Sequence, residues 1–170
     1  MMIGAVKMMQ SVAEGVLAVV GLISLLLAIG GAVVAYAQWR RHLSESRAKF
    51  LKSLLEEFYN TEMVGFFLDV DYGKFKYANF HGGPYERITD KALSLASYIC
   101  YLKNTGVITG GEFRFFQYDI DRLARNIEIL KYMHFLYHFA KQNSTAFSYQ
   151  CLYDHGKSMK FFDSEAFEKE

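Results

Sequence analysis

Seven side chains between residues 72 and 87 are suited to binding a small anion that carries a flat group. Cationic side chains bind phosphates, and aromatic faces stack on bases, as in nucleotide recognition. Glycines at 82 and 83 let backbone amides approach an anion. An ordinary surface loop, with aromatics folded onto the core and solvated lysines, is the alternative. The predicted ligand-binding residues are Lys74, Lys76, Tyr77, Asn79, His81, Tyr85 and Arg87.

Two further pairs of residues have a spacing that suits metal binding. His134 and His138 stand four apart, as do Cys151 and His155, so each pair can share one helical face. Together they would fill a tetrahedral zinc shell. However, the first pair lies in an aromatic run, where histidine is more often a packed residue, and no HExxH motif is present. We therefore expect packed histidines and no metal site.

Motifs of catalysis and cofactor binding are missing from the sequence. Asp69-x-Asp71-x-Gly73 begins like a calcium loop, but its glycine comes one position early and Phe80 stands where the bidentate glutamate belongs. Neither a Walker motif, GxSxG nor GxGxxG occurs, and neither cysteine lies in a nucleophile signature. We expect a non-enzymatic protein without a cofactor.

Helical patterns surround the candidate loop on both sides. Asn60, Thr109 with Glu112, and Asn126 each precede an apolar helical pattern and are expected to cap its first turn. The Gly-Gly-Pro cluster at 82–84 marks a loop. A short hairpin over residues 74–80 is one alternative within it. Helices are expected at residues 40–59, 61–70, 88–103, 110–123, 127–139 and 147–159.

An uncharged run of 23 residues, 15–37, precedes these helices and ends at Trp39-Arg40-Arg41. At 1.5 Å per residue it forms a helix of roughly 35 Å, enough to cross a hydrocarbon core of ~30 Å. The sequence therefore predicts one transmembrane helix at residues 15–39. A signal peptide cleaved after Ala35-Tyr36-Ala37 is the alternative, although the run is about twice the usual h-region of about 7–15 residues.

Charge on either side of this run sets its orientation. Lys7 and Glu14 balance before it, whereas residues 40–52 carry five basic residues against Glu45. Positive flanks stay in the cytoplasm. The sequence thus predicts an external N-terminus, anchoring in the inner (cytoplasmic) membrane, and a cytoplasmic C-terminal domain.

Small residues repeat along the predicted anchor at intervals of three and four. Such a seam lets helix backbones approach closely within a bilayer. It predicts a homo-oligomer, although glycine and alanine are also common in membrane helices by chance. The predicted interface consists of Gly21, Ser24, Ala28, Gly31 and Ala35.

Composition limits the remaining part of the chain. Every aromatic residue lies at or after Tyr36, which excludes a disordered tail. The whole chain has 19 basic and 18 acidic residues, and so lacks the basic surplus of a general nucleic-acid binder. Two cysteines in a cytoplasmic domain are expected as thiols.

The predicted fold class is all-α, with the anchor continuing into a compact cytoplasmic domain of about five helices. The organisation is a short external N-terminus at 1–14, the transmembrane helix at 15–39 and a stalk helix at 40–60. An aromatic-rich helical domain at 61–162 and an acidic tail at 163–170 complete the chain.

This architecture of anchor, basic flank and aromatic-rich helical domain resembles small bacterial membrane effectors of antiviral defence. Among them are effectors that answer cyclic oligoadenylate made by type III CRISPR complexes. The resemblance implies a membrane-anchored sensor of a small anionic ligand, such as a cyclic nucleotide, that perturbs the membrane as a homo-oligomer. A membrane tether that binds a cytoplasmic protein is the alternative. No functional residue is carried over.

Topology gives the first testable prediction. Because the basic flank follows the apolar run, a C-terminal reporter should be cytoplasmic. Protease added to intact spheroplasts should leave residues 40–170 undigested, while permeabilised cells serve as the control. Digestion of these residues in intact spheroplasts, or a mature chain that begins at Gln38, would contradict the orientation.

Overall fold

The computed structural model describes the backbone of residues 2–79, 83 and 85–169, and side chains at 21, 24 and from 27 onward within that range, except at 79. The described chain is helical and contains no strand, which confirms the all-α class. The helices are α1 (Met2–Phe58), α2 (Thr61–Asp71), the 3-10 turn η1 (Tyr77–Asn79), α3 (Tyr85–Asn104), α4 (Gly110–Arg125), α5 (Ile127–Gln142), α6 (Gln150–Ser158) and α7 (Ser164–Glu168).

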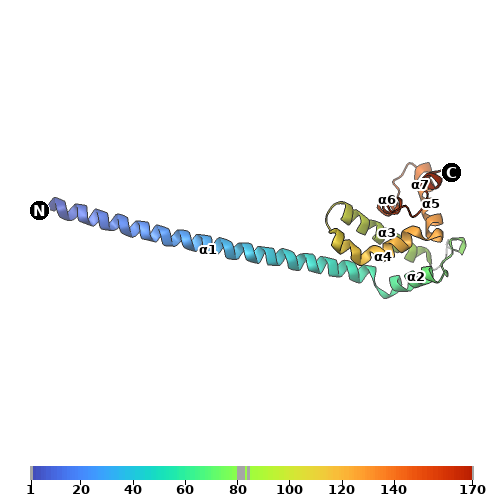
Figure 1. The fold of residues 1–170 in the computed structure, drawn as a ribbon, viewed down its shortest axis with the longest axis horizontal. Helices are drawn as coiled ribbons and strands as arrows, with labels where there is room; N and C mark the ends of the chain where they lie inside the picture. The colour runs from blue at the N-terminus through green and yellow to red at the C-terminus, as the bar shows by residue number, and fades with distance from the viewer. Residues whose placement is uncertain (1, 80–82, 84, 170) are drawn as a thin grey trace. The chain divides into compact units, whose positions relative to one another are not determined.

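Two compact units divide the chain, residues 1–50 and residues 51–170. The first unit is a single uninterrupted stretch of α1 (Figure 1). Within the part of the chain whose side chains are described, no helix is long and apolar enough for a membrane span. Residues 15–20, 22, 23, 25 and 26 of the expected span lie outside that part. The transmembrane helix therefore stays a prediction.

Local capping interactions begin three of the helices, as the sequence predicts. The Asn60 side chain accepts the backbone N–H of Met63 at 3.0 Å to start α2. Thr109 and Glu112 form both bonds of a capping box before α4, and Asn126 caps α5. Each cap satisfies N–H groups that the helix leaves unpaired and contributes about 1 kcal/mol.

The hairpin considered for residues 74–80 is wrong in the part that the structure describes. The chain turns at Gly73, whose φ is +66°, and the backbone N–H groups of Lys74 and Phe75 both bond to the Asp69 carbonyl. Phe75 is then buried, with 2% of its surface exposed. The alternation of polar and aromatic residues therefore does not mark a strand. Phe75 is a buried residue in a turn, and the 3-10 turn η1 follows directly.

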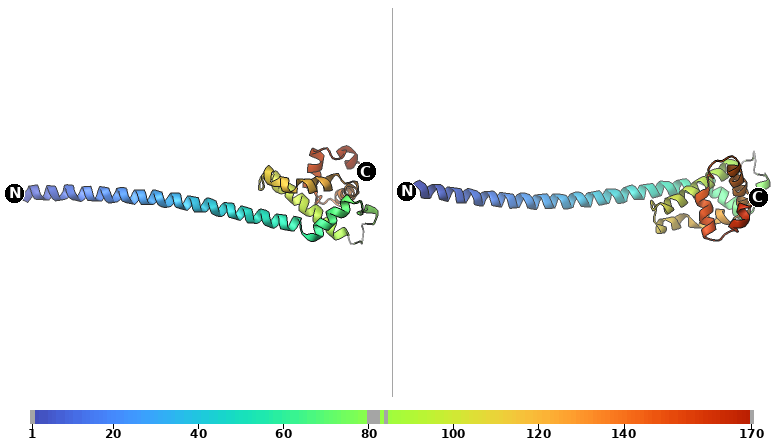
Figure 2. Two further views of the ribbon diagram at one scale, coloured as in Figure 1. Left: turned by 60° about the horizontal axis from the view of Figure 1, so that its bottom comes forward. Right: turned by 90° about the horizontal axis from the view of Figure 1, so that it is seen from above.

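An aromatic core holds the second unit together. Phe58, in the last turn of α1, is fully buried and packs edge-to-face on Phe116 of α4, with ring centroids 5.4 Å apart. Phe67 of α2 lies at the same distance from Phe58. Helix α3 packs against α2, α4 and α6, so it runs through the middle of this unit (Figure 2). The end of α1 is thus part of the domain core.

The expected acidic tail, residues 163–170, contains a folded element. Asp163 accepts the backbone N–H groups of Glu165 and Ala166 and so caps α7. Phe167 of that helix is 7% exposed and lies among rings of α5 and α6. The Phe167 ring, together with hydrogen bonds from Tyr153 and Lys157 to Glu168, therefore fixes the C-terminal segment to the domain.

The two neighbouring phenylalanines of α4 provide a matched test of this core. Phe116→Ala removes a fully buried ring and should lower the free energy of unfolding by about 3–5 kcal/mol. Phe115→Ala removes a ring that is 62% exposed and should change it by less than about 0.5 kcal/mol. Urea unfolding followed by near-UV circular dichroism measures both, and equal midpoints would contradict the assignment of the core.

Candidate functional site

The predicted ligand-binding loop is divided between two places in the domain. On the α2 side, the Lys74 ammonium lies 3.2 Å from a carboxylate oxygen of Asp69. The Tyr85 hydroxyl donates to the other oxygen of Asp69 at 3.0 Å. The hydrogen bond from Lys74, followed by that from Tyr85, lowers the pKa of Asp69. The hydrogen bond between Tyr85 and Asp69 also raises the pKa of Tyr85.

Arg87 also has a carboxylate partner on this side. Its guanidinium donates to Glu62 of α2 at 3.0 Å, and Lys91 lies 3.8 Å from the same carboxylate. A cavity of about 360 Å³ between α2 and α3 is lined by Glu62, Asp69 and Tyr85, among others. The carboxylates of Asp69 and Glu62 thus engage Lys74, Arg87 and Lys91. The predicted ligand-binding cations on this side of the loop are therefore paired with α2.

Tyr77 and Lys76 lie on the other side, next to α5. The backbone N–H of Tyr77 donates to Glu128 at 2.9 Å, and the Lys131 ammonium lies 2.8 Å from the same carboxylate. Hydrogen bonds from Lys131 and then Tyr77 lower the pKa of Glu128, and the charge of Lys76 adds to the shift. The side chain of Asn79, and His81 entirely, lie outside the described residues.

The two histidine and cysteine pairs belong to different clusters. His134 and His138 have ring centroids 4.3 Å apart and lie beside α7, where His138 Nε2 is 3.3 Å from the Phe167 carbonyl. His155 Nε2 instead lies 2.7 Å from Asp121 of α4. Over the described residues, no group of three or more potential ligands is placed to hold a metal ion.

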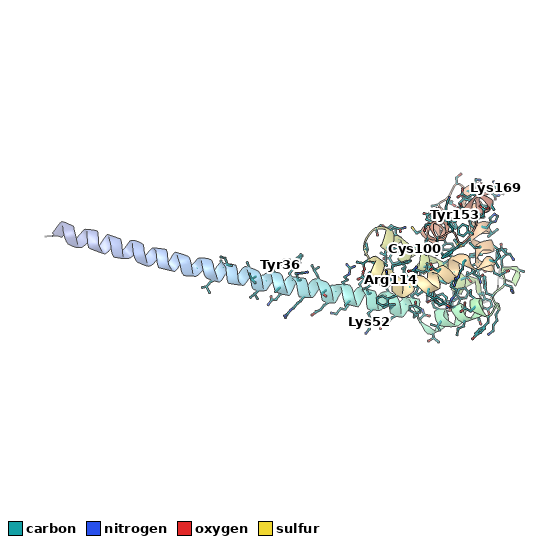
Figure 3. All side chains as sticks on the ribbon, viewed as in Figure 1. Tyr36, Lys52, Cys100, Arg114, Tyr153 and Lys169 are labelled. Atoms are coloured by element: carbon teal, nitrogen blue, oxygen red, sulfur yellow. The ribbon has the colours of Figure 1, made fainter. Side chains whose placement is uncertain are left out.

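Neither thiol is activated for nucleophilic chemistry. Cys100 lies on α3 inside the helical domain (Figure 3), and burial raises its pKa to about 12. Burial also raises the pKa of Cys151. Because the thiolate is the reactive form, both cysteines are weak nucleophiles at neutral pH. The calcium-like carboxylates are likewise engaged, since Asp71 pairs with Arg122 at 3.2 Å.

A large apolar groove runs along α5, and no separate sequence pattern predicted it. Its volume is about 770 Å³, within the range of about 300–1,000 Å³ that is usual for small-molecule sites. Helix α5 forms its floor, with η1 and the residues around α7 beside it. The apolar lining consists mainly of Ile127, Leu130, Phe135, Phe139, Phe162 and Phe167.

Few polar groups face this groove. They belong to Tyr77, Lys131, His134, His138, Gln142 and Asp163. The Asp163 carboxylate is engaged at the N-terminus of α7, and the Lys131 ammonium is paired with Glu128. The arrangement can therefore hold an apolar body and fix its orientation through a small number of polar contacts.

A signal for the groove was present in α5 but could not be separated from its core pattern. Ile127 and Phe139 fit the apolar periodicity of a core helix, yet they are 64% and 54% exposed. Phe135, on the same outward face, is 42% exposed. Apolar residues therefore cover more of α5 than the single stripe that a core requires. This excess is the feature that could have indicated a binding surface.

The small-residue seam of α1 is open in the isolated chain. Gly21, Ser24, Ala28, Gly31 and Ala35 are all exposed. A Cβ atom placed on Gly21 or Gly31 would meet nothing within 4 Å. This stretch of α1 therefore has room for another helix to pack closely.

Comparison with known proteins gives no family for this chain. No protein-family model, curated protein or solved structure matches it. Its function is therefore inferred from the geometry above.

The pairing of Lys74 leads to a test by titration. The folded pKa of Asp69 is lowered, so the pairing stabilises the fold above the unfolded pKa of about 3.9 and is lost as the pH falls through the folded pKa. Carbon-13 NMR of the carboxyl group should show a titration midpoint below that of a free aspartate. Lys74→Gln should raise it, and Lys91→Gln should not. An unchanged midpoint in Lys74→Gln would mean that the lysine is free to bind ligand.

Proposed function

We propose that this chain is a single-pass, membrane-anchored, non-enzymatic receptor whose helical domain binds a small ligand and which acts as a homo-oligomer. The groove along α5 is the observation that carries the proposal. Its volume of about 770 Å³ and its apolar lining are those of a small-molecule site. A folded domain that served only as a spacer would have no reason to expose Ile127, Phe135 and Phe139 on one side.

A binding role is supported by the state of the reactive side chains. Burial raises the pKa of both cysteines, which keeps the thiols protonated. His155 is held by Asp121, and its ring lies edge-on to Phe113 in the domain interior. Catalysis needs a nucleophile or base that reaches a substrate. These groups serve packing instead.

Anchoring and self-association are proposed from α1. The uncharged run at 15–37 with its basic flank supports insertion in the cytoplasmic membrane with residues 40–170 inside. The exposed small residues support contact between copies of the anchor. We further propose that ligand binding rearranges these copies and perturbs the bilayer, in the setting of bacterial antiviral defence. That setting is supported by the architectural resemblance.

A small nucleotide remains within this proposal, but its place changes. Lys74 and Arg87 are engaged by Asp69 and Glu62, whereas Tyr77 lines the α5 groove. The part of the loop proposed to contact ligand is therefore the part next to α5. Bulk nucleic acid is not a proposed partner, because the charge of the chain is nearly balanced.

A second candidate function, a tether for a cytoplasmic protein, is favoured by a different surface. Phe115 and Tyr118 of α4 are both 62% exposed, and Tyr98 and Tyr101 stack on the outside of α3. Exposed aromatic residues are typical of protein interfaces. A receptor would bind its small ligand at α5, whereas a tether would bind its protein partner at α3 and α4.

Hydrogen exchange of the full chain in phosphatidylcholine vesicles tests the receptor proposal. The panel contains mononucleotides, cyclic oligoadenylates and single-chain fatty acids. At 100 times its dissociation constant, a bound ligand stabilises the folded domain by about 2.7 kcal/mol. Amide hydrogens of α5 that exchange only when the ligand has left and the helix opens should therefore exchange about 100-fold more slowly. Ala166→Trp, which fills the groove beside α7, should abolish this protection.

Phe115→Trp is the matched control, because it enlarges an exposed aromatic side chain of α4 that lies outside the groove. It should leave the protection of α5 unchanged. If no member of the panel protects α5, the receptor proposal is contradicted and the tether is favoured.

A further inference from the structure

We infer that the α5 groove binds an amphiphile with one acyl chain and one anionic head group, its tail along Phe135 and Phe139 and its head beside Lys131. The inference rests on the proposed receptor function and names the chemical class of its ligand. The two parts of such a molecule match two different features of the groove.

The tail is matched by the length and lining of the groove. Helix α5 spans 16 residues, which at 1.5 Å per residue gives a floor of roughly 22 Å. One acyl chain in a bilayer spans about half of a ~30 Å core, or roughly 15 Å, so a chain of this kind fits along α5. Phe135 and Phe139 stack on each other with centroids 6.2 Å apart, and both are about half exposed. A tail lying on them removes apolar surface from water.

The head group is matched by the charges where η1 meets α5. Lys131 lines the groove and pairs with Glu128 at 2.8 Å, and Lys76 acts on the same carboxylate. Lys131 is the one basic residue among the described residues that line the groove. The Lys131 side chain is 52% exposed, so a head group can reach it. Asp163 lines the groove beside α7, and its carboxylate disfavours a negative head there.

The groove lining suits a single-chain amphiphile better than a nucleotide. A nucleoside phosphate brings several negative charges and base edges that need hydrogen-bond partners. The groove lining has one basic residue, Lys131, and one acidic residue, Asp163, and most of it is apolar. A single-chain amphiphile needs only one cation and a long apolar surface.

A photoreactive probe gives a site-resolved test in the full chain. A 16-carbon fatty acid with a diazirine in its tail is added to protein in phosphatidylcholine vesicles at about pH 9, where the carboxylate is ionised and lysine is still protonated. Crosslinked peptides are identified by mass spectrometry. We expect adducts on α5, reduced by excess unlabelled palmitate, and separate adducts on α1 that serve as an internal standard. Adducts confined to α1, or α5 adducts that palmitate does not reduce, would overturn the inference.

Variants then test the tail and the head separately. Phe139→Asp places a charge on the exposed floor and should reduce α5 adducts at least about ten-fold relative to those on α1. Phe115→Asp, on the exposed face of α4, is the matched control and should leave them unchanged. Lys131→Gln should reduce labelling by the acid several-fold but not labelling by the corresponding 16-carbon alcohol. Lys141→Gln, also on α5 but outside the groove lining, should affect neither probe.

The outcomes distinguish this inference from the receptor proposal. Equal α5 labelling in wild type, Phe139→Asp and Phe115→Asp would overturn the tail assignment. Equal effects of Lys131→Gln on acid and alcohol would overturn the head assignment. If nucleotides protect α5 from hydrogen exchange and the fatty acid does not label it, the ligand class is wrong while the receptor proposal stands. Near-UV circular dichroism of each variant establishes that the aromatic core is intact.

Discussion

Burial of the last turns of α1 is the constraint on which the helical domain depends. Phe58 has no exposed surface and packs against rings from α2 and α4. The next residue, Tyr59, donates its hydroxyl to Asp119 at 2.8 Å and to the Phe115 carbonyl at 2.7 Å. Burial, followed by the bond to Asp119, raises the pKa of Tyr59. Because a buried polar group is costly without partners, this cluster fixes where α1 ends and α4 packs.

Internal pairing of charges explains why the domain offers an apolar surface instead of a basic one. Lys74 and Arg87 pair with Asp69 and Glu62 of α2, and Lys131 pairs with Glu128 of its own helix. Asp90 accepts the hydroxyls of Tyr132 and Tyr149 in the same manner. Polar side chains thus join the helices, and the outward face of α5 is left with phenylalanine and isoleucine. A ligand for this face must be mainly apolar.

Local sequence signals predicted the helices well and the loop poorly. Asn60, Thr109 with Glu112, and Asn126 were assigned as caps because a side chain that bonds to the first helical turn needs only its near neighbours. The hairpin considered for 74–80 was wrong in the described residues because Phe75 is buried against Phe66 and Tyr85, from helices before and after it. No pattern within the loop reveals that burial, since its partners are distant in the chain.

The sequence by itself determined the helical class, the helix starts and the uncharged run, because propensity, capping and hydropathy depend on neighbouring residues. Tertiary structure alone decided which cations are engaged and which aromatics are exposed. Lys74 pairs with Asp69 of α2, whereas the backbone N–H of Tyr77, three residues later, donates to Glu128 of α5. Phe115 and Phe116 are adjacent, but one is exposed and the other fully buried. Such differences arise from packing between elements, and they turn a general prediction of binding into a groove with a defined lining.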